Sequence, residues 1–258
     1  MADEKAFANG NITVWVIPAA GIANHYAPTA AEINAGFNVS PAIAWDGTTL
    51  PSATESDDTD DRSLTDVGNA VTRGTEQFEA TLNMFRPRDV GDTVSDYGRA
   101  WQLLKSSRTT YYLVTRVLQA PNDPADPASV AAAGQWVSVF RMMADTVNDD
   151  TEGDDSVKYT VGFQPQGDIA VYTMVKTTSP VVVTPTTMAL GVGDAEQAEA
   201  TLAGRNVTQG ARWTSSNREV ADVSQGGVVK GLSAGAATIT VSHPSSNGTN
   251  GTIAVTVA

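Results

Sequence analysis

Hydrophobic and polar residues alternate one by one through several short segments near the C-terminus. The last segment places Ile253, Val255 and Val257 on one face and threonine or alanine on the other. Trp213, in an earlier segment, is large enough to pack between two sheets. A two-residue period with turns every ~8–12 residues is typical of a β-sandwich. The seven extended segments predicted here, separated by turns rich in glycine or asparagine, are 181–183, 195–202, 211–215, 220–223, 228–232, 236–241 and 252–257.

Residues 1–177 are also predicted to be mainly β. In "EQFEATLNMF" (76–85), alternate positions from Phe78 to Met84 are apolar. "VKYTVGFQ" (157–164) alternates too, and the Gln166-Gly167 pair that follows predicts a hairpin turn into "DIAVYTMV" (168–175). "TTYYLVTRVL" (109–118) and "QWVSVFRMM" (135–143) are apolar almost throughout, as expected of strands that are covered on both faces.

One segment of this first part has a helical period instead. "DTVSDYGRAWQLLKSS" (92–107) carries apolar side chains at Val94, Tyr97, Trp101 and Leu104. Asp92 is expected to cap its first turn, and basic residues follow toward its C-terminal end, where the helix dipole favours them. We therefore expect one amphipathic helix packed on a β-sandwich, with its apolar stripe in the core rather than in a cofactor cleft.

Charge divides the chain into the same two parts. The net charge is −13, and the residues up to Thr177 hold 24 acidic and 12 basic side chains, against 5 and 4 after it. The join, "TTSPVVVTPTT" (177–187), is rich in threonine and proline, and proline favours an extended backbone. The sequence predicts two domains, residues 1–177 and 178–258.

Composition excludes several classes of function. An acidic chain is unsuited to gripping nucleic-acid phosphates or anionic lipid, which requires a surplus of Lys and Arg. The absence of cysteine excludes disulfides and thiolate metal sites. No run approaches the ~18 apolar residues of a membrane span, and "MADEKAFANG" lacks the apolar core of a secretory signal. We expect a protein made in the cytoplasm and without a membrane partner.

The most patterned stretch, "WTSSNREVADVS" followed by "GVVKGLSAGAATITV", resembles the bacterial immunoglobulin-like domain of group 2. The resemblance covers about 80 residues. It implies an Ig-like fold and an adhesive or decorative role on a cell or virion surface, without catalysis. The positions that match the family pattern are Trp213, Ser215, Ser216, Ala221, Val223, Gly227, Val229, Gly231, Ala234, Gly235, Ala237 and Ile239.

The order of parts in residues 1–177 resembles the major tail protein of long, flexible-tailed bacteriophages. The features that carry this resemblance are "PTAAEINAGFNVSPAIAW" (28–45), a long polar loop, "VTRGTEQFEATLNMF" (71–85) and one helix between strands. The expected fold is a mainly β tail-tube sandwich or barrel with one packed helix, followed by an Ig-like β-sandwich.

The resemblance also implies what the protein does. Six subunits would form a ring, and stacked rings would form the tail tube of the virion, with DNA passing through the lumen without specific binding. Tape measure and tail terminator proteins would be partners, and the Ig-like domain would face outward. The long loop Gly47–Thr65 is our candidate for contact between rings, because loops of this length usually have a function.

Two acidic segments are candidate cation sites. The run 52–63 lacks the glycine and closing acid of a helix–loop–helix calcium site, so a solvated loop is the alternative that we favour. In 148–155, Asn148, Asp150, Glu152 and Gly153 have alternating ligand spacing, but the twelfth position is Tyr159 instead of an acid. The acidic residues of the first run are Glu55, Asp57, Asp58, Asp60 and Asp61.

The sequence assigns no catalytic, cofactor-binding or metal-binding residue. His25 and His243 have no neighbouring residues that form a triad or a metal pair. "GVGD" (Gly191–Asp194) is predicted to be a hairpin turn rather than a phosphate loop. Glycosylation sequons begin at Asn11, Asn206, Asn247 and Asn250, and they require a secretory route. Two other functions remain open, a surface adhesin with a glycan-binding Ig-like module and a hydrolase with an Ig-like accessory domain.

Overall fold

The computed structural model describes residues 12–53, 59–60, 71–72, 76–117, 130–150 and 156–258, and for 59–60 and 71–72 the backbone alone. Strands make up 51% of the structure and helices 9%, which confirms the prediction of a mainly β protein. The chain divides into two compact units. The first comprises residues up to Pro28, Glu32–Ala131 and Trp136–Thr173, and the second comprises Thr29–Ala31, Ala132–Gln135 and Met174–Ala258.

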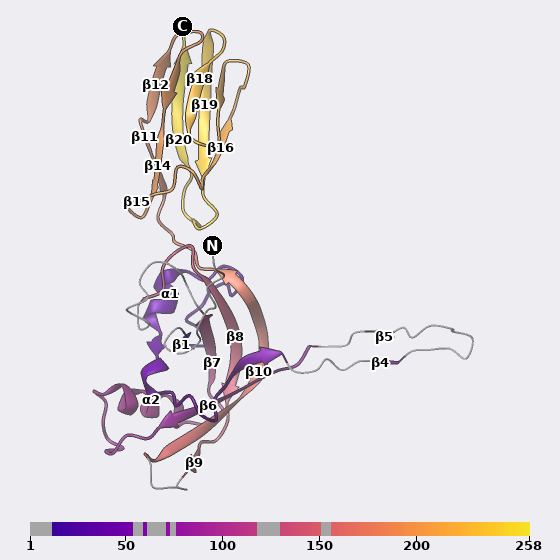
Figure 1. Cartoon of the computed structure of the whole chain (residues 1–258), viewed down its shortest axis with the longest axis vertical. Coiled ribbons are helices and arrows are strands. Elements are labelled where there is room, and N and C mark those ends of the chain that lie inside the picture. Colours follow the sequence, from indigo (N-terminus) through magenta and orange to yellow (C-terminus); the bar gives the residue numbers. More distant parts are fainter. Residues whose placement is uncertain (1–11, 54–58, 61–70, 73–75, 118–129, 151–155) are drawn as a thin grey trace, which may run out of the picture. The chain divides into compact units, whose positions relative to one another are not determined.

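The first unit is built on one strongly curved sheet (Figure 1). Its strands follow the order β2-β1-β7-β8-β10-β6-β3, and β9 pairs with the start of β10 on the edge opposite β6. Neighbours such as β1 and β7, or β7 and β8, are antiparallel. The strands are β1 (Ile12–Pro18), β2 (Phe37–Asn38), β3 (Thr49–Ala53), β6 (Phe78–Phe85), β7 (Thr110–Val117), β8 (Trp136–Ala144), β9 (Asn148–Asp150) and β10 (Lys158–Met174).

The core of this unit follows the alternation of the sequence. Ala80, Leu82 and Met84 on β6 are buried together with Tyr159 and Val161 on β10, as predicted. The helix α2 (Asp96–Leu104) and the short 3₁₀ helix η1 (Ser40–Ala42) contribute Ala and Leu side chains to the same cluster. Strands β7 and β8 are buried on both faces over most of their length, which confirms the expectation from their continuous apolar runs.

The predicted helix exists, but its start and its buried face differ from the prediction. Ser95, not Asp92, is the N-cap, and its side chain accepts a hydrogen bond from the Gly98 N–H. Val94 is 85% exposed and Tyr97 44% exposed, so the first half of the predicted stripe lies outside the core, whereas Leu104 is buried and Trp101 packs against the core, as predicted. Gly98 and Ala100 are also buried, and a Cβ on Gly98 would lie 2.6 Å from Asp92, so this position has room only for glycine.

A second helix and a continuous strand were not predicted. The helix α1 (Ala30–Ala35) is only six residues long, too short for its apolar spacing to be recognised. The hairpin expected at Gln166-Gly167 is absent, since β10 runs unbroken through this pair. Gly167 and Asp168 have φ values of 77° and 49°, and these two left-handed residues displace the strand locally without reversing it.

The second unit is the predicted Ig-like β-sandwich. A four-stranded sheet, β12-β20-β19-β16, accompanies two three-stranded sheets, β11-β14-β15 and β13-β18-β17. Two strands were missed, and the segment predicted at 195–202 divides between two sheets. The strands are β11 (Val181–Thr184), β12 (Thr187–Leu190), β13 (Ala195–Gln197), β14 (Glu199–Leu202), β15 (Arg205–Asn206), β16 (Arg212–Ser215), β17 (Ala221–Val223), β18 (Val228–Gly231), β19 (Gly235–Ser242) and β20 (Gly251–Val257).

Trp213 fills the centre of this sandwich, as predicted. Its side chain is 1% exposed, and the indole N–H donates to the Thr208 carbonyl at 3.0 Å. A Cβ on Gly227 would lie 2.9 Å from the Trp213 ring, so the glycine makes room for the indole. The Gly191–Asp194 turn is tight but is not a hairpin, because it joins β12 and β13, which belong to different sheets.

Candidate functional site

The two candidate cation segments lie largely outside the described residues. Glu55, Asp57, Asp58, Asp61, Glu152 and Gly153 lie outside the described residues, and only the backbone of Asp60 is described. Asn148 and Asp150 belong to β9, a strand rather than a coordinating loop, and Tyr159 is a core residue. No group of three potential metal ligands occurs among the residues that the structure describes. In that same part of the chain, no helix is long and apolar enough to span a membrane.

The two histidines belong to different units and have different surroundings. His25 Nδ1 lies 4.0 Å from Asp168 Oδ1, and the same carboxylate accepts from Arg141 at 3.1 Å. His243 Nδ1 accepts the Ser245 N–H at 3.1 Å. Burial, together with the charge of Lys176, lowers the pKa of His243. Neither geometry contains a nucleophile held against an imidazole base.

The segment predicted to be an irregular acidic loop contains strands. Thr49–Ala53 is β3, and a two-residue strand, β4 (Thr59–Asp60), pairs with β5 (Val71–Thr72). The prediction that Gly47 to Thr65 lacks regular structure was therefore wrong for these residues. Pro51 is compatible with β3 because it lies at the register irregularity between Thr49 and Ser52, on an edge strand.

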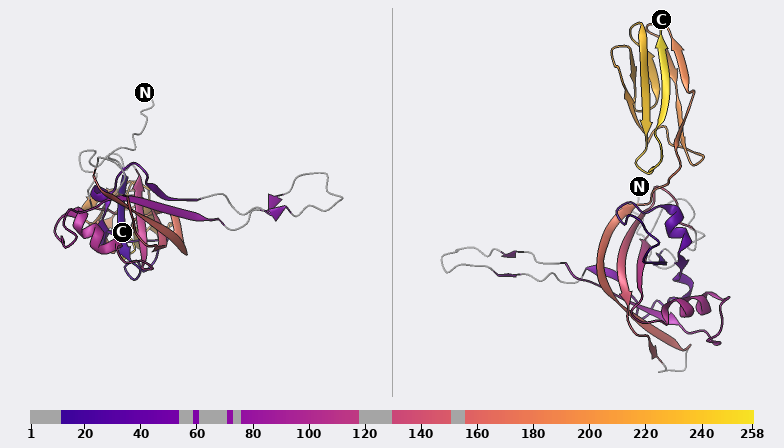
Figure 2. Two further views of the ribbon diagram at one scale, coloured as in Figure 1. Left: turned by 90° about the horizontal axis from the view of Figure 1, so that it is seen from below. Right: turned by 180° about the vertical axis from the view of Figure 1, so that it is seen from behind.

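The two ladders share one register. In β3–β6, Ser52 faces Glu79 and Ala53 faces Phe78, and in β4–β5, Thr59 faces Thr72 and Asp60 faces Val71. The residue numbers of every one of these pairs add up to 131, so β4–β5 continues the hairpin that β3–β6 begins. We call these two ladders the arm; all views place β4 and β5 beyond the body of the sheet (Figures 1 and 2).

Asn83 anchors the base of the arm. Its amide donates to the Asp46 carbonyl at 2.8 Å, and its backbone N–H donates to Thr48 Oγ1 at 3.0 Å. The Thr48 hydroxyl in turn donates to the Ala44 carbonyl at 2.7 Å. Gly47 has a φ of 73°, a left-handed conformation that this turn requires. The chain thus enters β3 in a fixed direction, beside Trp45, which is 68% exposed.

Replacing Asn83 with alanine should loosen this base. The change removes the only side-chain amide that pairs the Asp46 carbonyl among the described contacts, and a hydrogen bond of this kind contributes about 0.5–1.5 kcal/mol. We expect the melting temperature of the first unit to fall, and amide exchange in residues 44–53 to accelerate most. Asn148→Ala, at an exposed position on β9, is the control and should leave both unchanged. Equal exchange in 44–53 for the two variants would contradict the anchoring role.

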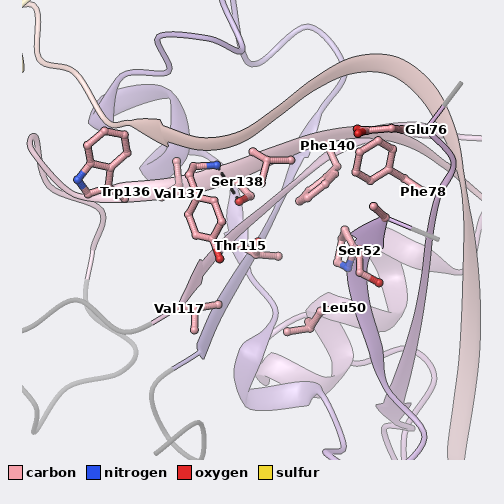
Figure 3. A pocket seen from close by; sticks show the side chains of 14 residues that line it. Leu50, Ser52, Glu76, Phe78, Thr115, Val117, Trp136, Val137, Ser138 and Phe140 are labelled. Atoms are coloured by element: carbon pink, nitrogen blue, oxygen red, sulfur yellow. Dashed lines mark hydrogen bonds between the residues drawn. The ribbon is translucent and has the colours of Figure 1, made fainter. Parts of the chain in front are cut away.

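A groove opens on the core side of the sheet, near the base of the arm. Its cavity volume is about 460 Å³, and side chains from β3 and β6 lie across from those of β7 and β8 (Figure 3). Val117, Trp136, Val171 and Tyr172 on its rim are 46%, 48%, 50% and 72% exposed. The lining residues are Leu50, Pro51, Ser52, Ala53, Glu76, Phe78, Thr115, Val117, Trp136, Val137, Ser138, Phe140, Val171 and Tyr172.

Sequence reasoning missed this groove. The apolar run 135–143 predicts a strand covered on both faces, and β8 is buried along most of its length. Trp136 at its start is nevertheless half exposed. The groove forms because the curved sheet brings β3 opposite β7, and no local pattern encodes that approach.

Comparison with known protein families decides what this fold belongs to. A family model described as "Phage tail tube protein" matches residues 1–178. The chain belongs to the phage tail tube protein family. A second model, "Bacterial Ig-like domain (group 2)", matches residues 177–254. Both resemblances predicted from the sequence are thereby confirmed.

Other comparisons with this tail tube protein are more distant. The search of curated proteins returns no match. A solved structure titled "Cryo-EM structure of the anti-feeding prophage (AFP) baseplate, 6-fold symmetrised" is similar at 13% sequence identity and a TM-score of 0.39. That similarity covers 65% of this tail tube protein and 95% of the other chain.

Membership in this family gives the arm and the sheet edges their context. A tail tube protein is a structural component of a bacteriophage tail, and its family implies assembly with other subunits. Surfaces that contact other subunits are therefore the functional sites to seek in the first unit. The arm, the open edges of the sheet and the groove are three such surfaces.

Proposed function

We propose that six copies of this chain form a ring and that stacked rings form a tail tube that conducts DNA. In this proposal residues 1–177 build the tube, and residues 178–258 form an Ig-like domain that decorates its outer surface. The mechanism is geometric and involves no cofactor. The protein functions in the virion tail after synthesis in the host cytoplasm.

The open edges of the first sheet carry the proposal. Among the described strands, the two ends of the order β2-β1-β7-β8-β10-β6-β3 pair on one side only. An unpaired edge presents backbone N–H and C=O groups that can bind another strand. Closing six sheets into one barrel pairs or covers these edges, which is how barrels abolish exposed edges.

The arm supports the stacking of rings. The paired residues of β4 and β5 keep the register of β3 and β6, so a second ladder follows the first in the direction of the same two strands. Its base is fixed by Asn83. We propose that the arm contacts a subunit of the next ring.

The negative charge of the first part supports conduction of DNA. Up to Thr177 the excess of acidic over basic side chains is 24 to 12. A lumen with this balance repels phosphate groups, so DNA slides without adhering. The tape measure and tail terminator proteins are the further partners that we propose, from the family resemblance.

Negative-stain microscopy tests this proposal on two matched proteins, the full chain and residues 1–177. We expect both to form rings and tubes at high concentration, since the Ig-like domain is proposed to be decorative. If the full chain forms tubes and the truncated protein is folded but forms none, the decorative role of the Ig-like domain is contradicted. Folded monomers of both at all concentrations would contradict the tube.

A further inference from the structure

An exposed apolar projection lies on the first unit, in the loop that leads into α2. Val94 is 85% exposed, the highest value among the large hydrophobic side chains described as exposed, and Val90 is 53% exposed. Tyr97 on the first turn of α2 is 44% exposed and stacks edge-on against Phe85 at 6.1 Å. We call Val90, Val94 and Tyr97 the knob.

The knob is held rigid by carboxylates that bond to its own backbone. Asp89 accepts the Gly91 N–H at 2.8 Å, and Asp92 accepts the Val94 N–H at 2.7 Å. The Gln102 amide of α2 donates to the Val90 carbonyl at 2.6 Å. The hydrogen bond from the Ser95 hydroxyl, followed by those from the Val94 and Ser95 N–H groups, lowers the pKa of Asp92. Fixing apolar side chains in an exposed position before binding lowers the entropy cost of association.

The groove offers a surface that suits the apolar side chains of the knob. It is mainly apolar, its cavity volume of about 460 Å³ accommodates several side chains, and Glu76 is the one charged residue among the described residues that line it. Arg88, which lies two residues before Val90 beside the knob, is exposed and carries the opposite charge. Asp89 and Asp92 direct their carboxylates to backbone N–H groups, and Asp96 lies on the first turn of α2, where the helix dipole favours it.

We propose that the knob of one subunit inserts into the groove of a second copy of the same chain. The occupant is another copy because the tail tube protein family implies assembly with further subunits and each subunit presents both surfaces. Such a contact is heterologous, so it repeats from copy to copy and generates a ring or a filament. The inference rests on the proposed tube and identifies one of its subunit contacts.

The contact between knob and groove is small, so it is observed only at high protein concentration. Three knob side chains and a groove of this volume bury much less surface than the roughly 1,200–2,000 Å² of a stable interface. The contact alone therefore does not hold a dimer at low concentration. It contributes specificity within an assembly that the sheet edges and the arm also stabilise.

Cysteine cross-linking tests the contact directly, since the chain has no cysteine of its own. Val94→Cys and Val171→Cys are made as separate full-length proteins, mixed at high concentration and oxidised. We expect a disulfide-linked heterodimer in the mixture, with a yield roughly tenfold above that of the control mixture, because a shared contact raises the local thiol concentration. The control replaces Val171→Cys by Gln164→Cys, an exposed position on the same strand. The double variant Val94→Cys/Val171→Cys should give a ladder of larger oligomers.

Charge reversal provides a second measurement. Arg88→Glu should lower the cross-linking yield at low salt, and Glu76→Arg in the groove partner should restore it. Microscopy of the same samples separates this inference from the proposed function. If tubes form but the cross-linking yield equals that of the control mixture, the knob-and-groove contact is contradicted and the proposed tube is supported. Cross-linked ladders without tubes support the contact and contradict the tube, and the absence of both contradicts both.

Discussion

Replacing Trp213 with alanine is expected to unfold the Ig-like unit while leaving the tube unit folded. Removing a buried tryptophan costs about 3–5 kcal/mol, comparable with the whole stability of a small domain. Here the indole is 1% exposed, its N–H pairs with the Thr208 carbonyl, and Gly227 packs against its ring. The unfolding transition of residues 178–258 should disappear from calorimetry at room temperature and above, with amide protection lost on β16, β19 and β20.

The chain provides a matched control in Trp45. It is the same residue type, but it is 68% exposed and belongs to the first unit. Trp45→Ala should change the stability of its unit by no more than about 0.5 kcal/mol, the usual range for exposed positions. Retained protection on β16 and β19 in Trp213→Ala would contradict the central role of the indole.

Removing residues 54–77, which include the outer ladder β4–β5 of the arm, is expected to block tube elongation without unfolding the subunit. Ala53 and Phe78 face each other in the ladder, so a two-residue Asn-Gly turn can join them in place of residues 54–77. The core of the first unit, including Leu82, Met84 and Tyr159, lies outside the replaced segment. Melting temperature should stay close to that of the full chain. Negative-stain images should contain rings or short stacks in place of long tubes.

A charge-only variant separates the length of the arm from its acidity. The double substitution Asp57→Asn/Asp58→Asn keeps the length of the segment and removes two negative charges. If the acidic segment acts through solubility alone, both variants should aggregate more readily than the full chain, and the shortened protein that stays in solution should still form long tubes. Long tubes from the shortened variant would therefore refute the stacking role. Limited proteolysis adds a second readout, since an arm that contacts the next ring is cleaved in monomers and protected in tubes.

The sequence predicted those features that depend on a residue and its immediate neighbours. Alternation identified β6, β19 and β20 with their buried faces, and the size of Trp213 placed it in the core. The short strands β12 and β15 were missed because two to four residues carry too little pattern, and β12 pairs with β20 in parallel across a long separation in sequence. The hairpin predicted at Gln166-Gly167 was wrong, because Gly167 takes a left-handed conformation within β10 without reversing the strand.

The arm, the groove and the knob could not be predicted from the sequence, because each depends on contacts that the local pattern does not show. Proline and a run of carboxylates dominate the local signal from Pro51 to Asp61, so the pattern indicates a loop. The strands there form because partner segments later in the chain supply their hydrogen bonds. The groove likewise depends on the curvature of a whole sheet. The exposed position of Val94 depends on the hydrogen bond that its N–H donates to Asp92, a residue that a helical pattern assigns to a cap.

The shared register of β3–β6 and β4–β5 constrains how such a protein can vary in length. A residue inserted on one side of the arm turns every side chain beyond it to the opposite face, whereas a residue inserted on both sides preserves each face. Matched insertions lengthen the arm in increments of about 3.4 Å and leave the turn held by Asn83 untouched. The reach of the subunit toward its neighbours is therefore adjustable independently of its core, and the spacing of an assembly could diverge between related phages while the fold of the subunit stays the same.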